Sequence, residues 1–114
     1  MIDAATVNDL VIQYEKHGWK LERVLLTGEL FSKLDGGLTQ QYGSGVVHLS
    51  NVDAVWFSRP NGDKTSWEIR RLIGSPFALV RFVPVDANPG ECEAILQSAE
   101  IEIANSLTAS PTEH

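Results

Sequence analysis

The stretch from Val52 to Val85 constrains the fold of this chain more than any other. Short runs of β-branched and aromatic residues alternate there with polar residues, and two turn sequences interrupt the runs. The first turn is Arg59–Asp63, with Pro60 and Gly62 inside it, and the second is centred on Gly74. Runs of this kind, separated by turns rich in glycine and proline, are typical of strands joined by hairpins. The segment therefore predicts an antiparallel meander of three strands.

The register of the first hairpin decides which side chains share a face of the sheet. A three-residue loop centred on Asn61 pairs Val55 with Trp67. A two-residue loop is the competing choice, and it would place Glu68 and Arg70 beside Val55. We predict the three-residue loop, because it leaves one face of the hairpin almost wholly apolar.

The second hairpin is predicted to pair Ile69 with Val80, because Gly74 suits the first central position of a type II′ turn. This pairing extends the apolar face of the first hairpin across the third strand. We expect one or both helices of the chain to cover that face. It comprises Val55, Phe57, Trp67, Ile69, Val80 and Phe82.

The opposite face of the meander is predicted to be mixed in character. Trp56 and Leu79 make it more apolar than a solvated sheet surface needs, while Glu68, Arg70 and Arg81 add charge. Such a surface is either covered within the chain or used by a partner. An arginine can bind a carboxylate in a fork, and a tryptophan ring offers a flat apolar platform. These five residues are therefore the candidate partner face.

The segments on either side of the meander predict helices and further strands. Val7, Leu10, Val11 and Tyr14 recur at helical spacing. Asn88 and Glu91 have the spacing of a capping box. The predicted elements are a helix over 4–17, a strand over 19–26, a short helix over 27–34, a glycine-rich loop over 35–45, a strand over 46–49, and a helix from 89 to about 107.

Together these elements predict one α+β domain over residues 1–107, followed by a disordered tail over 108–114. Its core would be a single antiparallel sheet of four to five strands, with the meander over 52–85 at its C-terminal side. The N-terminal and C-terminal helices would pack against this sheet. With 114 residues, the chain is long enough to bury a substantial core.

Composition excludes several classes of protein. A net charge of −6 argues against general binding of nucleic acid, although Arg59, Lys64, Arg70 and Arg81 are a possible basic group in the meander. No apolar run approaches the length of a membrane helix, and the first residues do not resemble a signal peptide. A single cysteine precludes an internal disulfide and fits a cytoplasmic location.

Sequence motifs for catalysis are missing. The three histidines and the one cysteine lack metal-ligand spacing, and no nucleotide-binding or nucleophile motif occurs, so no metal or cofactor is expected. Cys92 lies on the apolar stripe of the last helix and is expected in the core. A small-ligand or enzyme site is the alternative hypothesis. It would lie between the 35–45 loop and the sheet, using Tyr42 and His48 with Glu68 and Arg70.

The leading hypothesis is a binding or assembly protein. The charge is segregated, with five basic residues over 54–85 and six acidic residues but no Lys or Arg from Asp86 to the end. This segregation, the absence of catalytic motifs and the mixed face that carries Trp56 all favour this hypothesis. Two copies would pair through that face, forming a homodimer, or the face would dock another protein.

Overall fold

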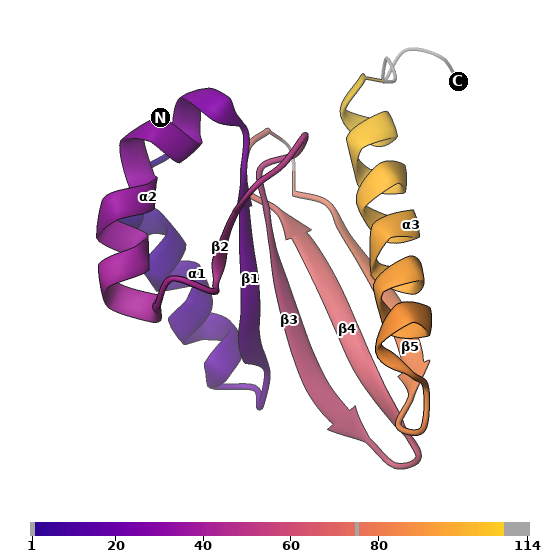
Figure 1. Cartoon of the computed structure of the whole chain (residues 1–114). Helices are drawn as coiled ribbons and strands as arrows, with labels where there is room; N and C mark the ends of the chain where they lie inside the picture. Colours follow the sequence, from indigo (N-terminus) through magenta and orange to yellow (C-terminus); the bar gives the residue numbers. More distant parts are fainter. Residues whose placement is uncertain (1, 75, 109–114) are drawn as a thin grey trace.

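The structure, a computed structural model, describes residues 2–74 and 76–108, with side chains described as far as Asn105. This part of the chain forms a five-stranded sheet and three helices (Figure 1). The elements in chain order are α1 (Ala4–Glu15), β1 (Lys20–Leu26), α2 (Gly28–Tyr42), β2 (Val47–Leu49), β3 (Ala54–Asn61), β4 (Lys64–Arg71), β5 (Ala78–Pro84) and α3 (Pro89–Thr108).

The sheet has the strand order β2-β1-β3-β4-β5. The α+β class and the C-terminal meander β3-β4-β5 are confirmed. The expectation of a purely antiparallel sheet needs one correction, because β2 runs parallel to β1. Helix α2 lies between these two strands in the chain, and a crossover of this kind is what a parallel pair requires. Strand β2 consequently lies at the far edge of the sheet from the meander.

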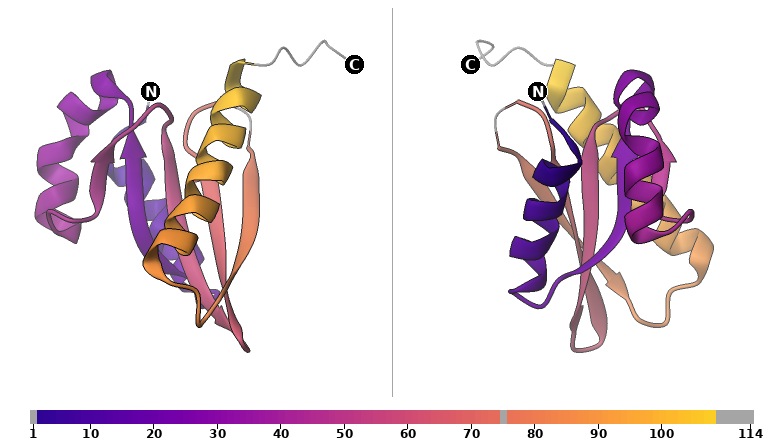
Figure 2. Two further views of the ribbon diagram at one scale, coloured as in Figure 1. Left: turned by 45° about the vertical axis from the view of Figure 1, so that its right-hand side comes forward. Right: turned by 90° about the vertical axis from the view of Figure 1, so that its left-hand side faces the viewer.

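Both faces of the sheet are covered, which makes three layers (Figure 2). Helices α1 and α2 pack on one face, here called the α1–α2 face, and bury Val24, Val55 and Phe57. Helix α3 packs on the other, the α3 face, and buries Trp56 and Ile69. Neighbouring strand residues alternate between the two cores. The prediction of a single apolar face was therefore wrong.

The first hairpin has a different register from the predicted one. Asn61 pairs with Lys64, so the loop is Gly62-Asp63 and Val55 lies opposite Arg70. Gly62 has a φ of 63°, which suits the first central position of a type II′ turn. The observed register differs by two residues from that of the competing two-residue loop, and a shift of two residues leaves every side chain on the same face. The side chains of β3 and β4 therefore lie on the faces that the competing loop predicts.

The second hairpin is displaced by one residue from its predicted register. Ile69 lies opposite Leu79, and Glu68 opposite Val80. A displacement by one residue exchanges the two faces of the strand. Leu79 and Val83 of β5 therefore join the α3 face with Ile69, while Val80 goes to the α1–α2 side.

Helix α2 is longer than predicted and replaces the expected loop over 35–45. Leu30, Leu34 and Leu38 recur every four residues, and all three are buried in the core under the α1–α2 face. Burial of this stripe outweighs the low helix propensity of the two glycines at 36 and 37. The helix ends before Gly43, whose φ is 102°.

The ends of the outer helices follow the sequence signals. Asp3 accepts a hydrogen bond from the Thr6 amide and caps α1. Asn88 and Glu91 bond reciprocally at the start of α3, each accepting from the other's backbone amide. The C-terminal helix is thereby confirmed. Thr108 belongs to it, and the rest of the predicted tail lies outside the described residues.

Candidate functional site

Three of the five residues of the predicted partner face lie under or beside α3. Trp56 is fully buried, and its Nε1 donates to Glu100 of α3 at 2.8 Å. Leu79 is half-buried against the same cluster. Arg81 forms a 2.6 Å ion pair with Glu102 of α3. This side of the sheet is therefore covered within the chain.

The other two residues, Glu68 and Arg70, lie on the opposite side of the sheet. The structure thus divides the predicted set between two faces, because both hairpins differ from their predicted registers by an odd number of residues: Val55 lies opposite Arg70 rather than Trp67, and Ile69 lies opposite Leu79 rather than Val80. Glu68 and Arg70 instead meet Tyr14 of α1. Tyr14 was predicted only as part of the apolar stripe of its helix, and no sequence signal linked it to β4.

Tyr14 joins the helix to the sheet through one polar and one aromatic contact. Its hydroxyl donates a hydrogen bond to Glu68 Oε2, and Arg70 lines the same hollows beside it. Its ring stacks on Phe57 with centroids 3.9 Å apart and an interplanar angle of 7°. Burial, reinforced by the bond to Glu68, raises the pKa of Tyr14 to about 12. The hydroxyl is therefore protonated at neutral pH and acts as a donor.

Three hollows meet at Tyr14, and we call them together the Tyr14 groove. One of about 230 Å³ is lined by His17, Trp19 and Glu68, among others. A second of about 320 Å³ lies towards Leu10 and Arg70. The third, of about 250 Å³, has Glu68 and Arg70 on one side. Its remaining lining, besides Tyr14, is Pro76, Phe77 and Ala78.

The alternative ligand site of the sequence analysis is not assembled. Tyr42 lies at the end of α2, where its hydroxyl donates to Asn8 Oδ1 at 2.7 Å. His48 lies on β2, with Nε2 3.0 Å from the carbonyl of Gly45. Strands β1 and β3 separate β2 from the strand that carries Glu68 and Arg70. Residues 35–42 of the predicted loop that was to close this site belong to α2.

The α1–α2 face is open over β5. Helices α1 and α2 bury side chains of β1, β2 and β3, and Figure 2 shows them over that half of the sheet. Val80 and Phe82 point to the same side from β5 and are 41% and 55% exposed. The Lys64 ammonium lies 5.9 Å from the centroid of the Phe82 ring. An apolar strip therefore remains at this end of the sheet.

The outer edge of β5 has backbone groups that no other strand of the sheet pairs with. The Arg71 amide donates to the Phe77 carbonyl, and the Val85 amide donates to the Asp63 carbonyl. These bonds show that the odd-numbered residues of β5 direct their backbone groups towards β4. Because bonded and non-bonded pairs alternate in an antiparallel ladder, the even-numbered residues direct their N–H and C=O groups outward. These residues are Ala78, Val80 and Phe82, with Pro84 following.

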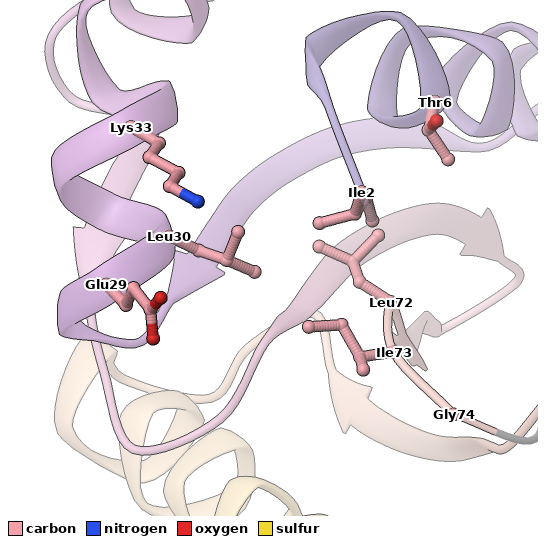
Figure 3. A pocket seen from close by; sticks show the side chains of 8 residues that line it. All are labelled: Ile2, Thr6, Glu29, Leu30, Lys33, Leu72, Ile73 and Gly74. Atoms are coloured by element: carbon pink, nitrogen blue, oxygen red, sulfur yellow. The ribbon is translucent and has the colours of Figure 1, made fainter.

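A larger cavity, of about 480 Å³, opens between the start of α1, the start of α2 and the end of β4 (Figure 3). Ile2, Leu30 and Leu72 point towards one another across it. Its charged residues, Glu29 and Lys33, come from one turn of α2. An apolar cleft with charges from a single helix lacks the convergent polar groups of a catalytic site. The remaining lining residues are Thr6, Ile73 and Gly74.

Other candidate chemistry is weak in the described part of the chain. Burial raises the pKa of Cys92, so its thiol is a poor nucleophile. No cluster of three or more histidine, cysteine, aspartate or glutamate side chains is placed there to hold a metal. The basic residues of the meander are dispersed: Arg59 lies over the Trp19 ring at 4.5 Å, and Arg81 is paired on the α3 face.

Comparison of the chain with protein families, with curated proteins and with solved structures gives no match. Within the described residues, no helix has both the length and the apolar character that crossing a bilayer needs. The features of this chain that bear on function are therefore the Tyr14 groove, the open part of the α1–α2 face and the edge of β5.

Proposed function

We propose that this chain is an assembly protein that pairs with a second copy of itself through the edge of β5. The observation that carries the proposal is the outward row of backbone groups on Ala78, Val80 and Phe82, two of which also expose apolar side chains. Exposed edges of this kind are templates for adding a strand. A cytoplasmic location, as expected of a chain with one cysteine, belongs to the same proposal.

The two edges of the sheet differ in how they are protected. Strand β2 has three residues, and a very short edge strand offers little to pair with. Strand β5 has seven residues and a regular register with β4 throughout. It has neither a bulge nor a charged side chain on its α1–α2 side. The contrast favours β5 as the assembly edge.

An isologous pair of β5 strands has a favourable register with Val80 on the two-fold axis. In an antiparallel pair, Val80 of one copy then lies opposite Val80 of the other, and Phe82 lies opposite Ala78. A large side chain thus meets a small one on the apolar side. On the α3 side Arg81 lies opposite Leu79, which avoids placing two like charges together.

One feature of β5 opposes association and sets its strength. Arg81 Nη1 donates to the outward carbonyl of Val80 at 3.0 Å while Nη2 binds Glu102. The carbonyl retains a second lone pair, and an exposed ion pair contributes only about 0–1 kcal/mol. Displacing Arg81 therefore costs little, and we expect a reversible dimer.

The decisive variant is Val80→Pro. Proline lacks the outward N–H, yet the bonds to β4 come from the odd-numbered residues and stay in place. Proline is tolerated on edge strands when its nitrogen faces outward. Val80→Ala is the matched control, because it shortens the same side chain and keeps the N–H. Circular dichroism verifies that both variants fold.

Light scattering across a concentration series measures the molar mass of each variant and tests the proposed dimer. We expect the wild type and Val80→Ala to approach twice the chain mass of 12.5 kDa as concentration rises, and Val80→Pro to remain at the chain mass. A wild type that stays monomeric up to millimolar concentration contradicts the proposal. So does a Val80→Pro variant that dimerises as strongly as the wild type.

A further inference from the structure

The Tyr14 groove holds two opposite charges that are not ion-paired with one another. Glu68 and Arg70 both project from β4 to the α1–α2 side, and the ion pairs of the described residues involve other side chains. Glu68 instead accepts a hydrogen bond from the Tyr14 hydroxyl, and Arg70 lines the same hollows as Tyr14. One negative and one positive group therefore lie on either side of Tyr14.

The separation of these charges suits a small ligand. Alternate residues of a strand lie about 7 Å apart, and here both side chains line one hollow beside Tyr14. A carboxylate binds an ammonium, and a guanidinium binds a carboxylate through paired N–H groups. A ligand with an amine and a carboxylate a few atoms apart would satisfy Glu68 and Arg70 together.

The walls of the groove add an apolar surface beside the charges. Pro76 lies at the Arg70 end, and Trp19 lies at the Glu68 end. The Arg59 guanidinium lies 4.5 Å from the centroid of the Trp19 ring, so this ring contributes apolar surface beside an existing cation. The Phe77 ring packs with the cluster under α3. The other polar residues that line the groove are Asp9, Gln13 and His17.

We infer that the Tyr14 groove binds a free amino acid, with its ammonium at Glu68, its carboxylate at Arg70 and its side chain against the apolar wall. A carboxylate-only ligand would meet repulsion from Glu68, and an amine-only ligand would meet repulsion from Arg70. The groove therefore selects a zwitterion over either single charge.

This inference does not rest on assembly through β5. The groove and the edge have Ala78 in common, but a second copy added to the edge extends the sheet in its own plane, whereas Glu68 and Arg70 lie on the face beside Tyr14. Binding can therefore fail while association persists, and association can fail while binding persists.

Isothermal titration of the wild type with each of the twenty common amino acids tests the inference. We expect saturable binding of at least one of them, with a Kd of about 1 mM or tighter. The best ligand is then compared with its analogue lacking the amine and its analogue lacking the carboxylate. Each analogue should bind about 10-fold more weakly or worse, because each leaves one charged group of the groove unpaired.

Two variants locate the site. Arg70→Gln and Glu68→Gln each remove one charge with little change of shape, and each should weaken binding about 10-fold or more. Arg81→Gln is the matched control, since it removes the same charge as Arg70→Gln on the α3 face, and it should leave the Kd unchanged. The inference is overturned if no amino acid gives saturable heat at up to about 10 mM. It is equally overturned if the analogues bind as well as the amino acid, or if binding survives in Arg70→Gln.

Discussion

Replacement of Trp56 tests whether this side chain belongs to the core under α3, as the structure shows, or to a partner surface, as predicted from the sequence. If Trp56 belonged to a partner surface, Trp56→Lys would leave the fold intact. In the structure this side chain is fully buried between β3 and α3. A lysine ammonium there would lie inside the apolar cluster under α3, and burying a charge is among the most destabilising changes known. We expect Trp56→Lys to unfold the chain.

Trp56→Phe gives a graded version of the same test. It removes the Nε1 donor to Glu100, and a hydrogen bond to a charged group contributes about 1.5–3 kcal/mol. Glu100 is half-buried and regains some water, which places the loss at the lower end of that range. Part of the edge contact with Trp67, at 6.0 Å between centroids, is also lost. We expect a loss of about 2 kcal/mol, a large share of a typical stability of about 5–15 kcal/mol.

Urea unfolding followed by circular dichroism measures this loss. With a slope of about 1–3 kcal/mol per molar urea, the midpoint should fall by about 1 M. A double-mutant cycle with Glu100→Ala separates the hydrogen bond from the packing, because Trp56→Phe should cost less when Glu100 is already absent. A change within about 0.5 kcal/mol for Trp56→Phe is the size expected of a surface site and would refute the reasoning.

Two further predictions concern α2 and Tyr14. Gly36→Ala should stabilise the chain by about 0.5–1 kcal/mol in the same urea assay, because Gly36 lies inside α2 with open space around its Cα. Gly43→Ala is the control and should destabilise the chain, because Gly43 has a φ of 102°. No gain in stability from Gly36→Ala would contradict a helix at that position. Because the pKa of Tyr14 is raised in the folded chain, its contribution to stability is complete below the unfolded pKa of about 10 and is lost as pH rises through about 12. The free energy of unfolding of the wild type should therefore fall between these two pH values. In Tyr14→Phe it should fall less.

Local signals in the sequence predicted the helices and strands better than they predicted how these elements pair and pack. Turn residues located the meander, and the capping pair of Asn88 and Glu91 located the start of α3, because these depend on neighbours in the chain. Helix α2 was cut short in the prediction because Gly36 and Gly37 outweighed the stripe that continues to Leu38. In the structure, burial of that stripe in the core stabilises a helix that continues through both glycines.

The register was the part that sequence reasoning could not decide. Maximising the apolar character of one face is a sound rule for a sheet covered on one side, but this sheet is covered on both. With two cores, Val55 and Trp56 are equally buried although they point in opposite directions. The odd-numbered error in the register of β3 and β4 separated Glu68 and Arg70 from Trp56, and the error of one residue in β5 separated them from Leu79 and Arg81. Both errors concealed the contact of Glu68 with Tyr14 on α1.

Amide hydrogen exchange along β5, measured by NMR in dilute and in concentrated solution, tests the assembly proposal most directly. The amides of Leu79, Arg81 and Val83 bond to β4 and should be protected at both concentrations. Those of Val80 and Phe82 face outward, and pairing with a second copy should protect them only in the concentrated sample. If these two amides exchange rapidly at every concentration, β5 is not an assembly edge.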